Sequence, residues 1–128
     1  MRKAFLEYLS AEGVISSDVA ENLQGLLRGV PEPIGSIAFS YGMITGSDID
    51  VILDEQRREY RPFGEIAMDM GMLRREQVET LLRIQQVRGA TDTAEALALS
   101  GVCSVEDTLK QLSQFLVSES MQPVVATE

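Results

Sequence analysis

Apolar residues recur along the chain at intervals of three and four, which places them on one face of an α-helix. In one such stretch Val78, Leu81 and Leu82 are apolar, whereas Glu79 and Thr80 between them are polar. No stretch shows the apolar and polar alternation of a half-buried strand. The pattern therefore predicts an all-α protein.

Turn and capping residues divide this pattern into eight expected helices. They cover residues 2–12, 17–28, 34–41, 47–60, 63–70, 75–88, 92–100 and 105–117. Three prolines lie between helices, at Pro31, Pro33 and Pro62, and Gly89 with the following Thr91 and Asp92 predicts a break near residue 90. The residues after 117 are mostly polar, so we expect a single all-α domain over 1–117 and a flexible tail over 118–128.

Glycines recur at a regular interval. Gly13, Gly42 and Gly71 are 29 residues apart, and Gly101 follows after 30. A glycine just past a helix takes the left-handed conformation, and the apolar residue after it packs back on the last turn. The spacing predicts four helix-turn-helix units, or αα-hairpins, packed as one helical domain.

Composition excludes several chemistries. The 128 residues include no His and a single Cys, and the formal net charge is −9. Without these side chains there is no disulfide, no zinc site of the usual ligands and no Ser-His-Asp or Cys-His arrangement, so we expect a non-enzymatic protein with no metal and no cofactor. The acidic charge argues against binding a nucleic-acid polymer.

The N-terminal stretch has acidic residues and a glycine where a signal peptide is apolar, and no apolar run is long enough to cross a membrane. We therefore expect a cytoplasmic protein with no membrane insertion. Between residues 57 and 88 there are seven arginines and five acidic residues. This stretch is either a solvated, ion-paired helix surface or a place for a small anionic ligand.

The two central units resemble each other closely. Residues 33–56 (PIGSIAFSYGMITGSDIDVILDEQ) align without gaps to residues 62–85 (PFGEIAMDMGMLRREQVETLLRIQ), with eight identities in 24 positions. A spacer of five residues, 57–61, separates them. The central two units therefore form a predicted tandem repeat.

The tandem segments are similar to the MshEN domain, the N-terminal module of type II secretion and type IV pilus assembly ATPases. That family carries two 24-residue motifs, RLGxxLxxxGxxxxxxLxxxLxxQ, separated by five residues, and binds cyclic di-GMP. The glycines, the later apolar positions and the final Gln of the motif are present in both segments. These positions are Gly35, Gly42, Ile49, Leu53 and Gln56, and Gly64, Gly71, Val78, Leu82 and Gln85.

Two motif positions differ from the family in both copies. The leading Arg is Pro33 and Pro62, and the first internal Leu is Ala38 and Ala67. Arg61 directly precedes Pro62, so it is the candidate to replace the missing arginine. With this replacement, the resemblance implies that cyclic di-GMP contacts Ile34, Gly35, Gln56, Arg61, Phe63, Gly64 and Gln85.

The same residues have structural interpretations. Gly35 and Gly64 either let a flat ligand touch backbone or let another part of the protein approach closely. The Gln amides pair either with a guanine edge or with a loop carbonyl. Cys103 is expected to be a small buried apolar residue.

Two functions remain. The first is a regulatory module that senses a cyclic dinucleotide and docks to a partner of a secretion, pilus or signalling system. The second is a protein-protein docking adaptor on the same scaffold that has lost nucleotide binding. In both, the expected surface is the groove between the two central hairpins, rimmed by Met68, Met70 and Met72 or by the arginines, and self-association is the nearby alternative.

Overall fold

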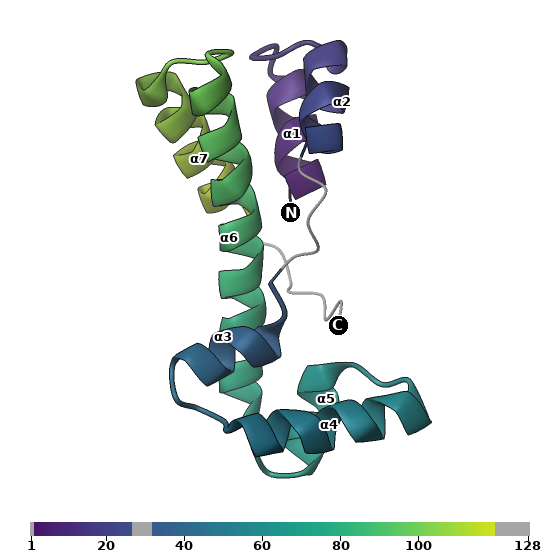
Figure 1. Cartoon of the computed structure of the whole chain (residues 1–128). Coiled ribbons are helices and arrows are strands. Elements are labelled where there is room, and N and C mark those ends of the chain that lie inside the picture. The colour runs from purple at the N-terminus through teal and green to yellow at the C-terminus, as the bar shows by residue number, and fades with distance from the viewer. Residues whose placement is uncertain (1, 27–31, 120–128) are drawn as a thin grey trace. The chain divides into compact units, whose positions relative to one another are not determined.

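The computed structural model describes residues 2–26 and 32–119, and in this part of the chain all regular elements are α-helices (Figure 1). The predicted all-α class is confirmed. The seven helices are α1 (Arg2–Ala11), α2 (Ser17–Leu26), α3 (Ile34–Ser40), α4 (Gly46–Glu59), α5 (Phe63–Asp69), α6 (Arg75–Ser100) and α7 (Val105–Glu119).

The chain divides into two compact units, each with its own apolar core. Of the described residues, 32–85 form the central unit, and 2–26 with 86–119 form the outer unit. In the outer unit α1 packs against α2 and α7. The ring of Phe115 lies with its centroid 5.0 Å from that of Phe5 and 5.4 Å from that of Tyr8, so α7 is held to α1 by aromatic contacts.

The central unit is built on α5, which contacts both α3 and α4 (Figure 1). The two short helices bury equivalent positions: Ile34, Gly35, Ile37 and Ala38 in α3, and Phe63, Gly64, Ile66 and Ala67 in α5. Ile52 of α4 and Leu81 of α6 complete the same core. The helical spacing of the apolar residues thus becomes a shared interior, whose burial is the main source of stability.

Helices end at the predicted glycines. Gly13, Gly42, Gly71 and Gly101 have φ values of 74°, 71°, 73° and 77°, in the left-handed region. After α3, the N–H of Met43 donates to the carbonyl of Ala38 at 2.9 Å, and the N–H of Gly42 donates to that of Phe39 at 3.0 Å. These two bonds define a Schellman ending. Met72 and Gly71 repeat them after α5, on Ala67 and Met68.

Among the described residues, three helices begin with a Ser or Thr side-chain cap, α2, α4 and α7, whereas α3 and α5 begin after Pro33 and Pro62 without one. At α4, Thr45 and Asp48 form a reciprocal capping box. The hydroxyls of Ser16 and Ser104 accept backbone N–H groups at α2 and α7. For α6 the sequence shows no capping Ser, Thr, Asp or Asn, yet the amide oxygen of Gln77 accepts the N–H of Arg74 at 2.8 Å.

The predicted break near residue 90 is wrong, because α6 is one continuous helix through this region. The hydroxyls of Thr91 and Thr93, which have the chemistry of capping groups, donate instead to the carbonyls of Val87 and Gly89 one turn earlier. Asp92 pairs with Arg2 at 2.9 Å. The carboxylate of Asp92, which the sequence suggested would cap a helix start, instead binds a residue 90 positions away in the chain.

The C-terminal boundary differs slightly from the prediction. Helix α7 continues to Glu119. The rest of the predicted tail, Pro31 and the end of the expected helix 17–28 lie outside the described residues. In the part of the chain that the structure describes, no helix has the length and apolar character needed to cross a membrane.

Candidate functional site

The seven residues that the resemblance assigns to a ligand all lie in the central unit. Four of them begin the two short helices and are buried: Ile34, Gly35, Phe63 and Gly64. Arg61 stands in the link between α4 and α5, Gln56 lies in the last turn of α4, and Gln85 lies in α6.

The backbone of Gly35 is covered by the protein itself. A Cβ at this position would lie 2.7 Å from the Cζ atom of Phe63, so the ring occupies the space in front of the glycine. A Cβ on Gly64 would lie 2.6 Å from a methyl group of Val78. Both glycines therefore allow close packing between α3, α5 and α6.

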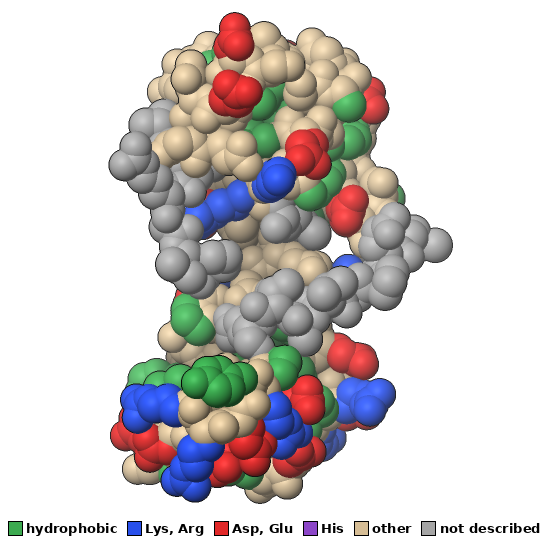
Figure 2. Space-filling view, turned by 90° about the vertical axis from the view of Figure 1, so that its right-hand side faces the viewer, with side chains coloured by type: hydrophobic (Ala, Val, Ile, Leu, Met, Phe, Trp, Pro, Cys, Tyr) green, Lys and Arg blue, Asp and Glu red, His purple; other side chains and the backbone are tan. Residues whose placement is uncertain are grey.

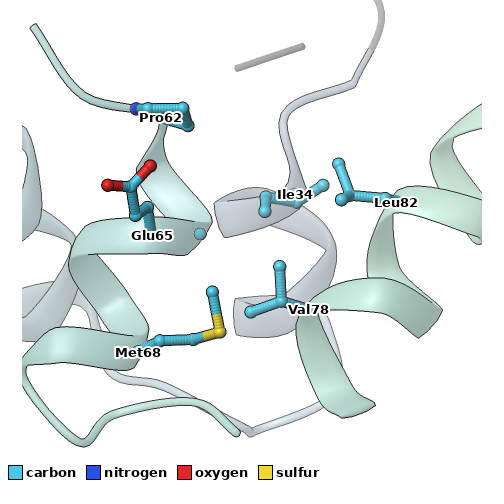
Figure 3. Close-up of a pocket in the computed structure, with 7 residues that line it drawn as sticks. Ile34, Pro62, Glu65, Met68, Val78 and Leu82 are labelled. Carbon is cyan, nitrogen blue, oxygen red and sulfur yellow. The ribbon is translucent and has the colours of Figure 1, made fainter. Parts of the chain in front are cut away.

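A small cavity remains beside Gly64. It measures about 120 Å³, and its other lining residues are Ile34, Pro62, Glu65, Met68, Val78 and Leu82. In Figure 3 the apolar side chains converge from α3, α5 and α6, whereas the carboxylate of Glu65 points away from Ile34. Pockets that bind drug-sized ligands measure roughly 300–1,000 Å³, so this space is too small for a dinucleotide.

Arg61 is surrounded by carboxylates. Its guanidinium pairs with Glu59 at 2.9 Å, with Glu65 at 3.0 Å and with Asp69. Hydrogen bonds to Asp69, Glu59 and Glu65 raise the pKa of Arg61 above its ordinary value, so the group stays charged. Three negative charges around one positive charge leave this corner net negative, and a phosphate would have to displace them.

The two motif glutamines differ. Gln85 is buried, and its side-chain amide donates to the backbone carbonyl of Glu32 at 3.0 Å. Glu32 immediately precedes Pro33 and α3, so this bond ties the start of the unit to α6. Gln56 is half-buried and makes no side-chain hydrogen bond within the described residues. For Gln85, the interpretation as a partner of a loop carbonyl is therefore correct.

Tyr60 has an unusual backbone. Its φ of 56° places it in the left-handed region, and among the described residues it is the one non-glycine there. This conformation ends α4, where the N–H of Tyr60 donates to the carbonyl of Gln56 at 2.9 Å. The side chain is 90% exposed. A bulky residue in this conformation is a genuine outlier, and the exposed ring adds no packing to offset it.

An open groove of about 460 Å³ runs along the first turns of α6. Its lining residues are Tyr41, Met43, Arg74, Glu76, Gln77, Thr80, Leu81 and Ile84. Tyr41, which is 66% exposed, follows directly after α3 and forms one wall. Of the rim predicted from the sequence, Arg74 lines this groove, whereas Met68, Met70 and Met72 do not. Met68 lines the small cavity, and Met72 packs against the central core.

Around the central unit, acidic and basic side chains are interspersed on the face shown in Figure 2. Arg57 and Arg58 pair with Asp54 and Glu55 on their own helix. Arg74, in contrast, forms no ion pair with any described residue. Within the described residues no cluster of carboxylates and Cys is arranged to hold a metal ion.

Of the groove residues, only Arg74 belongs to the sequence-based expectations. The other seven are Tyr41, Met43, Glu76, Gln77, Thr80, Leu81 and Ile84. Spacing gives part of the signal, because Thr80 and Ile84 are one helical turn apart and follow Arg74 and Gln77 on the same face. Tyr41 carries no such signal, since it reaches the groove through the turn after α3. Cys103 is partly buried and packs against the outer core.

Comparison with known proteins adds no relative. No protein-family model, no curated protein and no solved structure matches this chain.

Proposed function

We propose that this protein is a cytoplasmic, non-enzymatic docking module that binds another protein through its central unit. We further propose that its scaffold consists of four helix-turn-helix units, the central two being an MshEN-like tandem repeat that has lost nucleotide binding. The φ values of 71° at Gly42 and 73° at Gly71 and the Schellman bonds that recur at both glycines support the repeat.

The observation that carries the docking function is Tyr60. Left-handed backbone at a residue with a Cβ costs roughly 1–2 kcal/mol, and the 90% exposed ring returns no burial to the isolated fold. A strained residue with no role in packing indicates a functional surface. Tyrosine is enriched in protein interfaces because it buries a large ring and keeps a polar tip.

The residues that the resemblance assigns to cyclic di-GMP favour a docking function over nucleotide sensing. Arg61 pairs with three carboxylates, the ring of Phe63 covers Gly35, and the side-chain amide of Gln85 donates to the carbonyl of Glu32. These three residues of the candidate ligand site therefore already have partners inside the protein. By the same resemblance, the partner belongs to a secretion, pilus or signalling machine.

Affinity capture with the full chain tests this function. Wild type and the Tyr60→Phe variant should retain the same protein from a lysate of the native host, and Tyr60→Gly should lose it. Glycine suits the left-handed conformation better than tyrosine, so Tyr60→Gly is at least as stable and its loss of binding has no origin in unfolding. Recovery of nothing above background by wild type, or equal recovery by Tyr60→Gly, contradicts the proposal.

A further inference from the structure

Resting on the proposed docking function, we infer that the groove formed by Tyr41 and α6 receives a helical segment of the partner. That segment places a large apolar side chain between Tyr41 and Ile84 and a carboxylate against Arg74.

The shape of the groove favours a helix. It follows α6 from Arg74 to Ile84, which is about 15 Å at 1.5 Å per residue. This length matches three turns of a partner helix that contacts the groove through residues at positions i, i+4 and i+7. A partner strand would need the edge of a β-sheet to pair with. The regular elements of the described residues are all helices, so this part of the chain offers no such edge.

The lining of the groove calls for an apolar anchor. Met43, Leu81 and Ile84 supply aliphatic surface, and Tyr41 lines the groove with them. Two polar groups in the groove are already bonded inside the protein: the Gln77 amide oxygen accepts the N–H of Arg74, and the Thr80 hydroxyl donates to the carbonyl of Glu76. An apolar side chain therefore displaces water there without leaving these groups unpaired.

The charge of Arg74 indicates which residue of the partner lies next to its apolar side chain. Arg57, Arg58 and Arg61 have carboxylate partners in the chain, whereas Arg74 lines the groove with none among the described residues. A partner carboxylate supplies the missing pair in a charge-assisted bond. Glu76 also lines the groove, and the chain carries a net charge of −9, so the rest of the partner helix is neutral or basic.

Display selection tests the inference. A library of helical peptides is selected against the immobilised full chain, and the Kd of enriched peptides is measured by fluorescence anisotropy. Enriched peptides should share one large apolar residue with Asp or Glu one turn away. Arg74→Glu should weaken them about tenfold or more, as expected for loss of a charge-assisted contact. Tyr41→Ala should weaken them as well.

Matched variants distinguish the contact of the peptide with Arg74 from effects of overall charge and of unfolding. Lys110→Glu makes the same charge change at an exposed position of α7, outside the groove, and should alter the Kd less than twofold. Replacing the peptide carboxylate with Lys should restore binding to Arg74→Glu. The substitution leaves the bond from the residue 74 N–H to Gln77 in place, and circular dichroism checks that the fold is retained.

Two results overturn the inference. One is the absence of enriched peptides, and the other is enriched peptides that bind Arg74→Glu and Tyr41→Ala as tightly as wild type. Neither affects the Tyr60 capture experiment. If the host protein is retained by wild type, lost with Tyr60→Gly and still held by Arg74→Glu, docking stands and the assignment to this groove fails.

Discussion

The ring of Phe63 fills the space in front of Gly35, with its Cζ atom 2.7 Å from where a Cβ on residue 35 would lie. Phe63 is itself buried, so the ring has little room to retreat. The contact joins α3 to α5 at the position where the family resemblance expects a nucleotide. In the sequence, Gly35 suggests that a ligand could reach the backbone. In the structure, it lets Phe63 pack closely against α3 within the core.

Gly35→Ala should therefore destabilise the protein. Overpacking of a core costs about 1–3 kcal/mol, partly offset by the roughly 1 kcal/mol better helix propensity of Ala, so a net loss of about 1 kcal/mol is expected. Gly46→Ala is the control, since a Cβ there meets nothing within 4 Å. Urea denaturation compares the two variants. Equal stability of both would show that the ring does not block residue 35.

Alanine substitutions at Gly89, inside α6, and at Gly101, just after α6, should change the stability of the protein in opposite directions. Gly89 lies inside the helix, and a Cβ there makes ordinary contact at 3.5 Å with Arg2, so Gly89→Ala should stabilise by about 0.5–1 kcal/mol. Gly101 has a φ of 77°, and Gly101→Ala should destabilise by about 1 kcal/mol. Thermal unfolding of both variants measures the difference. A destabilised Gly89→Ala would favour the broken helix that the sequence suggested.

The tether from Gln85 to Glu32 predicts an asymmetry between the two motifs. Gln85→Ala removes a part-buried hydrogen bond to a carbonyl 53 residues away and should cost about 1–2 kcal/mol. Gln56→Ala, at the equivalent position of the first motif, should cost less than about 0.5 kcal/mol. The free energy of unfolding in urea tests both. Equal losses would mean that the bond to Glu32 contributes nothing measurable.

Tyr60→Gly should raise the stability of the isolated chain. Relief of the left-handed conformation gives about 1 kcal/mol, and removal of a 90% exposed ring takes away little burial. Tyr60→Ala serves as control, because Ala keeps the Cβ and its strain and should leave the melting temperature nearly unchanged. A lower melting temperature for Tyr60→Gly would indicate that the ring packs on the protein.

Features that depend on neighbouring residues could be predicted from the sequence. The helix endings at Gly42 and Gly71 follow from local backbone preference, and the cap at Thr45 follows from one side chain and an N–H three residues later. Such interactions lie within a single turn. The apolar spacing likewise identified α3 and α5 as short helices with one buried face.

Features that depend on distant contacts could not be predicted. Thr91 and Asp92 have the chemistry of a helix start, but Asp92 pairs with Arg2 across 90 residues, and α6 continues. At the candidate site the presence of Arg61 suggested phosphate binding. Here the missed information was local in part, because Glu65 stands four residues after Arg61, a spacing typical of an ion pair, whereas the contact with Asp69 depends on how the chain folds.

Calorimetric titration of the full chain with cyclic di-GMP tests most directly whether the motif residues serve the scaffold instead of a nucleotide. With Arg61 enclosed by three carboxylates and Gly35 covered by Phe63, wild type should give no saturable heat at the highest soluble ligand concentration. The Arg61→Ala variant should behave the same way. Saturable binding by wild type that Arg61→Ala abolishes would contradict the account and restore the sensing function.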